Sequence, residues 1–579
     1  MPGLIARLDA ILRPAFGTVE PGSDPVLRPS TRPGADYQAN GALPLAKRLG
    51  SPPAEVAAKV AAAAELAGVA TVEVAPQGFL NLTLDPRFTA AELRMQAADP
   101  RLGVTAVEGG KTVVVDYSAP NVAKEMHAGH VRTTIIGDSL CRLLEFVGDR
   151  VIRENHIGDW GTPFGMLIEH LLDIGEDTGA AELSVGDLDS FYRDARAKFD
   201  SAPAFAERAR HRVVLLQSGD PETLRLWRVL VDQSVSYFSE VYRRLGILLT
   251  PEDVVGESFY NDQIPSVVSE LDAKGLLVKS DGALCVFPPG FKNREGEPLP
   301  VIVQKSDGGF GYATTDLAAL RDRFGRLGAD LALYVVGAPQ SQHFAMCFAV
   351  GRMAGWIPEG AEAVHVSFGS MLGTDRRMFR TRAGDVVKLI DLVDEAVSRA
   401  TAAVERNADL DASLARDVAR AVGIGALKYA DLSTDRQRDY IFDWDRMLSF
   451  DGNTAPYLQY AHARICSIFR RADLDPAAFS FASAEVPVIL DEPGERALAI
   501  ALLGFETAVS ASLETFSPHK LCSYLFDLAG TFTTFYETCP VLRAESSEVR
   551  ASRLALCSLT AAVLRLGLAL LGIEAPQQM

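Results

Sequence analysis

Apolar and polar positions alternate along this chain with two different periods. In KTVVVDYS, residues 111–118, three consecutive valines precede a turn-prone SAPN, which is typical of a buried parallel strand and its exit loop. Apolar residues then recur at helical spacing as far as Gly148, where a glycine favours the end of a helix. VIREN, residues 151–155, predicts a second strand, so the whole segment predicts a strand, a helix and a strand. The periodic apolar residues of the helix are Val131, Ile135, Leu140, Leu143, Leu144 and Val147.

The first hundred residues contain shorter patterns of the same kinds. We expect an amphipathic opening helix, a stretch rich in proline and glycine over residues 14–33, and an alanine-rich helix over residues 54–67. The segment TVEVAPQGFLNLTL is strand-like, with a turn at Pro76 and Gly78. These elements predict a small α/β domain over residues 1–105.

The rest of the chain divides by the kind of pattern it carries. Residues 165–300 mix helices with short strands, which we interpret as an insertion, and the rhythm of strands and helices resumes at GFGYATTDLAAL, LALYVVGAP and AVHVSFGS. Almost only helices are expected after that. The chain is therefore predicted to be an α/β multidomain protein. Its later domains are an α/β domain over 106–390, a helical connector over 391–455 and an α-helical domain over 456–579.

Length and hydropathy restrict the class of protein. With 579 residues the chain suggests three to five domains of roughly 150 residues each. Hydrophobic residues make up 48% of it, yet no uninterrupted apolar run reaches the roughly 18 residues that a membrane-spanning helix needs. The first residues lack the basic start, apolar block and cleavage site of a signal peptide. We expect a soluble, cytoplasmic protein with no membrane partner.

Cysteine spacing and charge narrow the chemistry further. The seven cysteines occur singly, without a C-x-x-C pair, so they indicate neither a disulfide framework nor a zinc site. The formal net charge of -18 argues against indiscriminate binding to nucleic acid, because a phosphate backbone attracts lysine and arginine. A local basic track is compatible with this charge.

The most informative polar group lies where the first predicted strand leads into the predicted helix. It reads His127-Ala128-Gly129-His130. A helix N-terminus presents unpaired amide groups that suit phosphate, and the glycine lets a nucleotide approach the backbone closely. The two histidines can donate hydrogen bonds to phosphate oxygens, and Lys124 can add a positive charge. The segment therefore predicts a nucleotide phosphate site.

Other interpretations of the same tetrapeptide stay open when it is taken alone. The two histidines are equally well explained as polar residues on the first turn of a helix. A metal-binding pair is a weaker alternative, because no third cysteine or histidine follows at zinc-like spacing. The context of the tetrapeptide decides between them.

That context resembles a known family. HAGH resembles the first signature of class I aminoacyl-tRNA synthetases, and DYSAPNVAKEMHAGH, ENHIGDWGTPFGML and FDGNTAPYLQYAHARI resemble arginyl-tRNA synthetases in particular, over the whole length of the chain. The resemblance implies a doubly wound parallel sheet of the Rossmann type, an N-terminal domain that recognises the tRNA elbow, and a helical anticodon-binding domain. It also implies activation of L-arginine by ATP and transfer of the arginyl group to tRNA(Arg), with Mg²⁺ accompanying ATP and no zinc.

An arginine substrate requires carboxylates and amide oxygens in its pocket, because guanidinium is a planar cation with several donors. Asp316 lies four residues after Tyr312, so both would share one face of a helix start. Taken alone, Asp316 is also explained as a helix-capping carboxylate and Tyr312 as a core residue. By resemblance to the family, the arginine site consists of Asp116, Asn121, Tyr312, Asp316 and Gln340.

The chain departs from the family pattern at three positions. YVVGAPQSQH has Gly337 and Pro339 where many members carry an acidic residue and an arginine, although Gln340 and His343 stay in place. Gln578 stands near the end where an arginine is frequent. These departures permit a different pocket geometry and the loss of one tRNA contact.

A second phosphate-binding segment is expected in MLGTDRRMFRTRAGDVVKL. Class I synthetases usually carry a lysine-rich loop there, and here arginines replace the lysines, which is compatible with phosphate binding. An exposed basic turn explains the same residues equally well. The resemblance also implies that Lys124 compensates for the missing lysines, so the catalytic residues are His127, His130 and Lys124. The ATP-binding residues are Ala128, Gly129, His130, Arg376, Arg377, Arg380 and Arg382.

Aromatic residues and arginines interleave in the helical C-terminal region. Aromatic faces can stack on splayed bases and arginines can contact phosphates, which is how single-stranded RNA loops are usually bound. Packing of the tyrosines within a helix bundle is the alternative for each one taken singly. The resemblance favours a tRNA site at Tyr457, Tyr460, Arg464, Arg470 and Arg471.

Four functions are compatible with these observations to different degrees. The first is a housekeeping arginyl-tRNA synthetase, which we expect to be a monomer without an obligatory protein partner. The second is a paralogue for a specialised pathway or for inhibitor resistance, and the third is an inactive tRNA-binding module, which intact histidines and acidic residues disfavour. The fourth is another class I enzyme, which the lack of zinc spacing and the acidic pocket disfavour.

Overall fold

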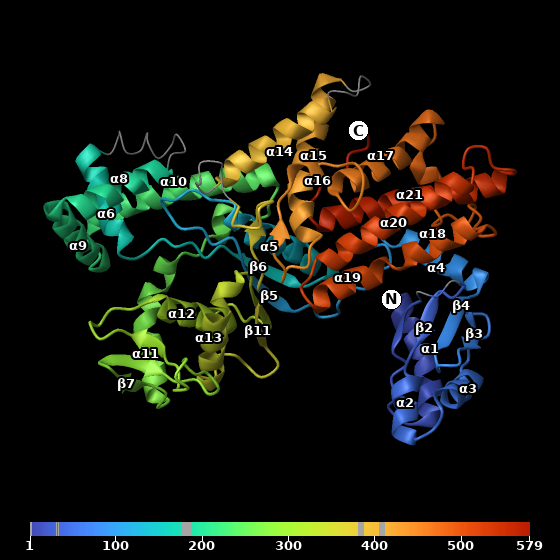
Figure 1. Ribbon diagram of the computed structural model, residues 1–579, viewed down its shortest axis with the longest axis horizontal. Helices are drawn as coiled ribbons and strands as arrows, with labels where there is room; N and C mark the ends of the chain where they lie inside the picture. The colour runs from blue at the N-terminus through green and yellow to red at the C-terminus, as the bar shows by residue number, and fades with distance from the viewer. Residues whose placement is uncertain (1–2, 31, 33, 176–187, 380–386, 405–410) are drawn as a thin grey trace. The chain divides into compact units, whose positions relative to one another are not determined.

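The computed structural model of the chain describes every residue except 1–2, 31, 33, 176–187, 380–386 and 405–410. Its contacts form two compact units. Unit 1 comprises Met1–Val107, Phe450–Leu570 and Glu574–Met579, and unit 2 comprises Glu108–Ser449 and Leu571–Ile573. In Figure 1, the blue N-terminal elements and the red C-terminal helices therefore belong to the same unit.

The N-terminal part of unit 1 is an antiparallel sheet with helices, in the strand order β1-β2-β4-β3. Gly78, at φ 90°, makes the turn between β3 and β4, a conformation that glycine adopts without strain. The small α/β domain expected from the sequence is confirmed. Its elements are α1 (Leu4–Val19), β1 (Leu27–Pro29), β2 (Tyr37–Ala39), α2 (Ala42–Leu49), α3 (Pro53–Ala63), β3 (Ala70–Val74), β4 (Leu80–Leu84) and α4 (Pro86–Ala98).

Two features of this domain differ from the sequence expectation. The first helix continues through Pro14 to Val19, although the proline-rich stretch was expected to begin at residue 14. Pro14 removes one helical N–H, but it is exposed, so water can satisfy the carbonyl that this N–H would have met. The prediction has no counterpart for β1, β2 and α2. The two strands were not expected because strands of three residues are too short to show a period of two.

The C-terminal part of unit 1 is a helix bundle, as expected. Two stretches within the described residues, Pro493–Glu514 and Ser547–Leu570, are long and apolar enough to cross a membrane by length and composition. In the bundle α21 packs against α17, α18 and α20, so the interior of a folded domain accounts for its apolar length. The helices are α17 (Ala455–Arg471), η4 (Pro476–Ala478), α18 (Pro493–Leu503), α19 (Phe505–Glu514), α20 (His519–Thr538) and α21 (Ser547–Leu570).

Unit 2 is built on a parallel sheet in the order β11-β10-β5-β6. The chain moves outward from β5 to β6 in one direction and from β10 to β11 in the other. Because such crossovers are right-handed, α5 and α13 cover opposite faces, which makes the sheet doubly wound as expected. The elements are β5 (Thr112–Asp116), α5 (Gly129–Val147), β6 (Arg150–Glu154), α12 (Tyr312–Gly325), β10 (Leu331–Tyr334), α13 (Ser341–Met353) and β11 (Glu362–His365).

Hydrophobic residues on both faces hold this sheet. On one face Val114, Ala332 and Ala363 pack with Leu320 of α12 and Phe348 of α13. Because side chains alternate along a strand, the neighbouring valines of β5 point to the opposite face, and they are fully buried too. Burial on both faces explains why β5 is a continuous run of valines.

The segment between β6 and α12 contains a helical group followed by a small antiparallel sheet in the order β7-β8-β9. It thus mixes helices and short strands as the sequence pattern indicated. The helices are α6 (Pro163–Ile174), α8 (Leu188–Ser201), α9 (Pro203–Gln217) and α10 (Pro221–Leu245). The remaining elements are η1 (Pro251–Asp253), η2 (Glu257–Gln263), α11 (Ile264–Ala273), β7 (Val278–Ser280), β8 (Ala283–Val286) and β9 (Val301–Gln304).

After β11 the chain of unit 2 is mainly helical, with one addition. Strand β13 pairs in parallel with β12, and each strand has only two residues, so neither was expected from the sequence. Helices α14 and α15 pack closely against each other. The elements are η3 (Ala338–Gln340), which lies before α13, then β12 (Met371–Leu372), α14 (Leu389–Val404), α15 (Ala412–Leu432), β13 (Tyr440–Ile441) and α16 (Trp444–Met447).

Gly137 of α5 packs tightly against the loop after β5. A Cβ atom built on it would lie 2.4 Å from the side chain of Tyr117. We expect Gly137→Ala to lower the free energy of unfolding of unit 2 by about 1–3 kcal/mol, because the buried tyrosine must shift. The midpoint of thermal unfolding, followed by circular dichroism, measures this.

Gly530→Ala in α20 is the matched control. A Cβ atom there meets nothing within 4 Å, so alanine should leave stability unchanged or raise it by up to about 1 kcal/mol. Equal melting temperatures for Gly137→Ala and the unmodified protein would contradict the tight contact at Tyr117.

Candidate active site

From β5 and β10, which are neighbours in the sheet, the chain proceeds outward in opposite directions. Ligands of doubly wound sheets bind between two such strands, at their carboxyl ends. Asp116 ends β5 and pairs in register with Tyr334, which ends β10. The loop of residues 117–128 leaves β5 at this edge and leads into α5. The predicted histidine motif therefore lies at the edge of the sheet where a ligand is expected.

The loop before the histidines is held in a strained backbone conformation. Ser118, Ala119 and Ala123 have positive φ angles of 74°, 49° and 58°. Each donates its backbone N–H to a side-chain oxygen, at 3.0 Å in all three cases. Strain of this kind costs about 1–3 kcal/mol per residue and persists only where surrounding contacts determine the conformation. The loop is therefore preorganised before any ligand binds.

Backbone donors fix both histidine rings. The N–H of Gly129 donates to Nδ1 of His127 at 3.0 Å, and the N–H of His127 donates to Nδ1 of His130 at 3.1 Å. The two rings lie 4.1 Å apart between centroids. Because Nδ1 accepts a hydrogen bond in each ring, the proton of the neutral imidazole lies on Nε2. Each ring thus has an Nε2–H donor.

Both rings are neutral near neutral pH. Burial lowers the pKa of His127, and burial together with the neighbouring His127 lowers the pKa of His130 to about 3. A neutral imidazole has one N–H donor and carries no charge. The pair therefore acts through hydrogen bonds rather than as cations.

Gly129 and Ala128 serve the motif through their backbones. A Cβ atom on Gly129 would lie 2.7 Å from the ring of His127, so only glycine lets this ring fold back over the helix start. The N–H of Ala128 donates to the carbonyl of Val387 at 2.9 Å, and the N–H of Leu389 donates to the carbonyl of Met126 at 2.8 Å. The motif is therefore bonded to the segment that follows the arginine-rich loop.

An ion pair strengthens this connection. The side chain of Lys388 lies 2.7 Å from the carboxylate of Glu125, which is almost fully buried. A buried carboxylate needs such a partner, because desolvation of an unpaired charge is costly. Neither residue was singled out from the sequence.

The predicted cations occupy different surroundings. Nζ of Lys124 lies 4.4 Å from the ring centroid of Tyr192, a cation–π contact. Arg376 and Arg377 are exposed in a turn closed by the N–H of Gly373 on the carbonyl of Arg377 at 2.8 Å. Arg380 and Arg382 lie outside the described residues.

The predicted arginine site is split between exposed and buried positions. Tyr312, on the first turn of α12, is 77% exposed, and Asn121 and Gln340 are exposed as well. Asp316 lies one turn further along the same face of α12. It accepts a hydrogen bond from Nε2 of His343 at 2.6 Å. This bond raises the pKa of His343.

Asp116 is buried and already has one partner. Its Oδ2 accepts from Nη2 of Arg323 at 2.9 Å, while Nε of Arg323 donates to Glu154 at 2.6 Å. Its Oδ1 is buried and has no partner among the described residues. Arg323 also lies over the ring of Tyr334, at 4.6 Å. One carboxylate oxygen of Asp116 therefore keeps its acceptor capacity for a ligand.

A further acidic group, which the sequence analysis missed, lies beside Asp316. Burial, and then the negative charges of Asp159 and Asp316, raise the pKa of Glu257 to about 8. Asp159 accepts from the N–H and the hydroxyl of Ser258 at 2.8 and 2.6 Å. A Cβ atom on Gly256 would lie 2.2 Å from this carboxylate, so glycine is needed there. The sequence signal was the unremarkable string GES, which carries no pattern of its own.

Helix α17 of unit 1 carries the predicted tRNA residues on two sides. Tyr457, Tyr460, Arg464 and Arg471 follow one another at intervals of three, four and seven residues, so they share one side of the helix. Tyr460 is 47% exposed, and Arg464 lies over the ring of Tyr536 at 4.6 Å. Arg470 points elsewhere and donates to the carbonyl of Gln577 at 2.7 Å.

Comparisons with known proteins agree along the whole chain. The family model of class I tRNA synthetases (R), catalytic domain, matches residues 95–444. The model of the DALR anticodon binding domain matches residues 458–579, and that of the arginyl tRNA synthetase N terminal domain matches residues 4–84. The chain belongs to the arginyl-tRNA synthetase family. It is therefore a class I aminoacyl-tRNA ligase.

Relatives and solved structures support the same family. The arginine–tRNA ligase of Thermobifida fusca is 54% identical over 578 residues, which are 100% of this chain and 99% of that protein. The Escherichia coli K12 protein of the same name is 51% identical over 94% of each chain. Crystal structures of arginyl-tRNA synthetases from Plasmodium falciparum and Thermus thermophilus align with TM-scores of 0.85 and 0.82, at 29% and 25% identity, each covering 100% of both chains.

The imidazole and carboxylate groups of this synthetase are suited to phosphates and to cations. Within the described residues no group of three or more histidine, cysteine, aspartate or glutamate side chains has the arrangement of a metal site. A magnesium ion bound by ATP needs no such group, since it takes its ligands mainly from phosphates and water.

The histidine geometry predicts a specific protonation state. Nitrogen-15 spectra of the synthetase should show the Nε2–H tautomer for His127 and His130 at about pH 7. The lowered pKa of His130 means that its ring stays neutral when the pH falls to about 5, where an ordinary histidine is charged. A ring of His130 that titrates near pH 6.5 would contradict the burial that keeps this ring neutral.

His343 provides the opposite control in the same spectra. Its pKa is raised by Asp316, so it should take up a proton at higher pH than an ordinary histidine. Asp316→Asn removes the charge and should lower this pKa, while His130 is unaffected.

Proposed function

We propose that the paired histidines and the acidic pocket carry the chemistry of an arginine–tRNA ligase in this chain. As such a ligase, the chain activates L-arginine with ATP to arginyl-adenylate and transfers the arginyl group to the 3'-terminal ribose of tRNA(Arg). The observation that carries the residue assignment is the pair of Nε2–H donors at the reversal point of the sheet.

In the first step the arginine carboxylate attacks the α-phosphate of ATP and pyrophosphate leaves. Charge develops on the phosphate oxygens, and neutral donors in a preorganised site stabilise it without prior desolvation of an ion. His127 and His130 supply these donors, the backbone of Ala128 and Gly129 allows close approach, and Lys124 supplies charge. Mg²⁺ accompanies ATP. Arg376 and Arg377 bind the leaving pyrophosphate, together with Arg380 and Arg382.

The arginine side chain enters a pocket whose charge is opposite to its own. Asp316 and the free Oδ1 of Asp116 accept from its guanidinium, and Glu257 adds a third carboxyl group to the set. Asn121, Gln340 and Tyr312 bind the polar atoms of the substrate at the exposed mouth of the pocket. Three carboxyl groups distinguish arginine from neutral amino acids of similar length.

The anticodon side of tRNA contacts the stripe of Tyr457, Tyr460, Arg464 and Arg471 on α17, in which Tyr460 and Arg471 are exposed and the other two are half-buried. Stacking of bases on tyrosine and pairing of phosphate with arginine let an acidic protein bind RNA locally. Arg470 contributes through the C-terminal tail that it holds. The protein acts in the cytoplasm as a monomer and needs no protein partner.

A housekeeping role is the form of this function that we favour. Identity of 54% over essentially the full length of an arginine–tRNA ligase supports it. The differences at Gly337, Pro339 and Gln578 leave a specialised paralogue as the second candidate, and charging kinetics with total tRNA separate the two.

Exchange of pyrophosphate into ATP tests the function directly. The purified protein is assayed with each amino acid, with and without total tRNA. We expect exchange with arginine alone and only when tRNA is added, as is general for the family. Exchange without tRNA would contradict the tRNA dependence, and no exchange with any amino acid would favour an inactive binding module.

Two substitutions separate the roles of the histidines and the acidic pocket in this assay. His127→Ala should lower the rate of adenylate formation more than the affinity for arginine, because the ring acts on transition-state charge. Asp316→Ala should weaken the binding of arginine by about 3 kcal/mol and so raise the KM for arginine. Equal losses of rate and affinity in His127→Ala would contradict its assignment.

Substitutions at an exposed and at a buried position of unit 1 test the proposed tRNA site on α17. Tyr460→Ala should raise the KM for tRNA by roughly 5- to 100-fold, the equivalent of about 1–3 kcal/mol for one stacked base, and leave the KM for arginine unchanged. Phe481→Ala, at a buried position of the same unit, should lower the melting temperature instead. An unchanged KM for tRNA in Tyr460→Ala would remove this residue from the site.

A further inference from the structure

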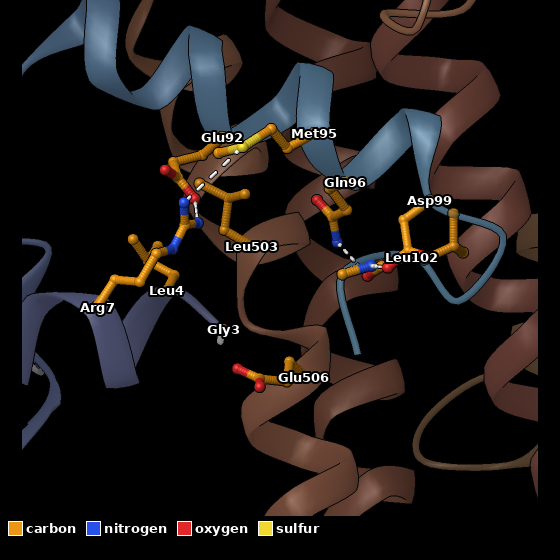
Figure 2. A pocket seen from close by; sticks show the side chains of 11 residues that line it. Gly3, Leu4, Arg7, Glu92, Met95, Gln96, Asp99, Leu102, Leu503 and Glu506 are labelled. Atoms are coloured by element: carbon orange, nitrogen blue, oxygen red, sulfur yellow. Dashed lines mark hydrogen bonds and ion pairs between the residues drawn. The ribbon is translucent and has the colours of Figure 1, made fainter. Parts of the chain in front are cut away.

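A cavity of about 260 Å³ lies within unit 1, whereas the histidines belong to unit 2. It is lined by the start of α1, the end of α4 with the loop that follows, and the corner between α18 and α19 (Figure 2). This volume is several times the roughly 30 Å³ that one water molecule occupies in the liquid. The cavity therefore has room for a small organic molecule.

Gln96 lines this cavity and keeps one acceptor unused. The side chain is 5% exposed, and its Nε2 donates to the carbonyls of Leu502 at 2.7 Å and Leu102 at 3.3 Å. These two carbonyls fix the orientation of the amide, since the reverse orientation would place oxygen against oxygen. Oε1 then lies on the other side of the amide, buried and without a partner among the described residues. An unsatisfied buried acceptor of this kind costs about 1–3 kcal/mol.

The charges around the cavity do not balance. One cationic side chain, Arg7, faces three carboxylates, Glu92, Asp99 and Glu506, and the α-amino group adds a second positive charge that acts on Glu506, which leaves a formal excess of one negative charge. Arg7 is committed to an ion pair with Glu92. Asp99 accepts from the backbone N–H groups of Arg101 and Gly103 at 2.9 and 3.1 Å. Glu506 has no ion pair with a cationic side chain among the described residues, but the N–H of Gly3 donates to it, and the charges of Arg7 and of the α-amino group oppose the rise in its pKa.

Glu506 is placed against the backbone of α1. Its Oε1 accepts from the hydroxyl of Thr105 at 3.0 Å, and burial raises its pKa. A Cβ atom on Gly3 would overlap the carboxylate, so glycine is required for this approach. Two oxygens of a carboxylate have about four acceptor positions, and these contacts leave some of them unused.

Apolar side chains complete the walls. Leu4, Met95 and Leu503 border the space between the polar groups. A ligand that satisfies this lining needs several N–H donors and a positive charge at one end and a short aliphatic part at the other.

We propose that this cavity binds a small organic cation. Its ammonium or guanidinium head donates to Gln96 Oε1 and to Glu506, and its aliphatic stem packs on Leu4, Met95 and Leu503. Because the cavity is formed by both chain-terminal parts of unit 1, the bound cation stabilises their contact by mass action. The site is separate from the proposed arginine pocket.

Methyl resonances of ¹³C-labelled methionine in the full-length protein test this. The probes are n-butylguanidinium, n-butylammonium and, as an anion of the same length, butyrate. We expect the Met95 methyl, assigned with Met95→Leu, to shift saturably with one or both cations and not with butyrate. The exposed Met353 of unit 2 is an internal reference.

Glu506→Gln provides the decisive variant, because it keeps the shape of the side chain and removes its charge. It should weaken the binding seen at Met95 about tenfold, equivalent to about 1.4 kcal/mol. Glu514→Gln, an exposed substitution on the same helix, should leave binding unchanged. No shift with either cation, an equal shift with butyrate, or binding insensitive to Glu506→Gln would overturn the proposal.

The same titration in Asp316→Ala excludes binding at the arginine pocket as the source of the signal. L-Arginine is also titrated into Asp316→Ala. A saturable shift of the Met95 methyl would identify the cation as the amino-acid substrate of the enzyme, and no shift would identify it as a different amine. Catalytic failure of Asp316→Ala has no bearing on the shift at Met95, so the two proposals can fail separately.

Discussion

The buried ion cluster of Arg323, Asp116 and Glu154 is the constraint on which the site depends. Asp116 and Glu154 end neighbouring parallel strands as register partners, so their carboxylates lie close together, and like charges in a buried place repel. Arg323, which is 1% exposed, bonds to both. The cation comes from α12, so one interaction fixes this helix against the carboxyl ends of β5 and β6. Removing one partner of such a cluster typically costs about 3–5 kcal/mol.

This cluster sets the position of the proposed arginine pocket through the rigidity of α12. Asp316 precedes Arg323 by seven residues, which is close to two helical turns, so the two side chains share one side of the helix. Anchoring Arg323 at the sheet therefore places Asp316 near the same edge. A second buried pair, Arg132 with Asp431 at 3.1 Å, ties the helix that carries the histidines to α15. The helix that carries the histidines and the helix that carries Asp316 are thus held by separate buried ion pairs.

The sequence predicted those parts of the fold whose signals are local. The valine run of β5, the helix after it and the glycine at its end lie within forty residues of one another, and the histidines sit inside this unit. The short strands β1, β2 and β13 gave no periodic signal, since their pairing is decided by partners elsewhere in the chain. Glu257 and Lys388 were missed for the same reason. Each acquires its meaning from a residue distant in sequence, Asp316 for the one and Glu125 for the other.

The acidic group of Glu257, Asp159 and Asp316 also has an electrostatic consequence that no motif states. Glu257 has a pKa of about 8, raised by burial and by the nearby Asp159 and Asp316, so it holds a proton near neutral pH. A guanidinium placed among these groups favours the ionised carboxylate, because opposite charges lower a carboxyl pKa. Binding of a cation and release of this proton are therefore linked, and each favours the other by the same free energy. In the proposed arginine pocket a neutral amino acid gains nothing from this exchange, whereas a cationic substrate is stabilised by the carboxylate that forms.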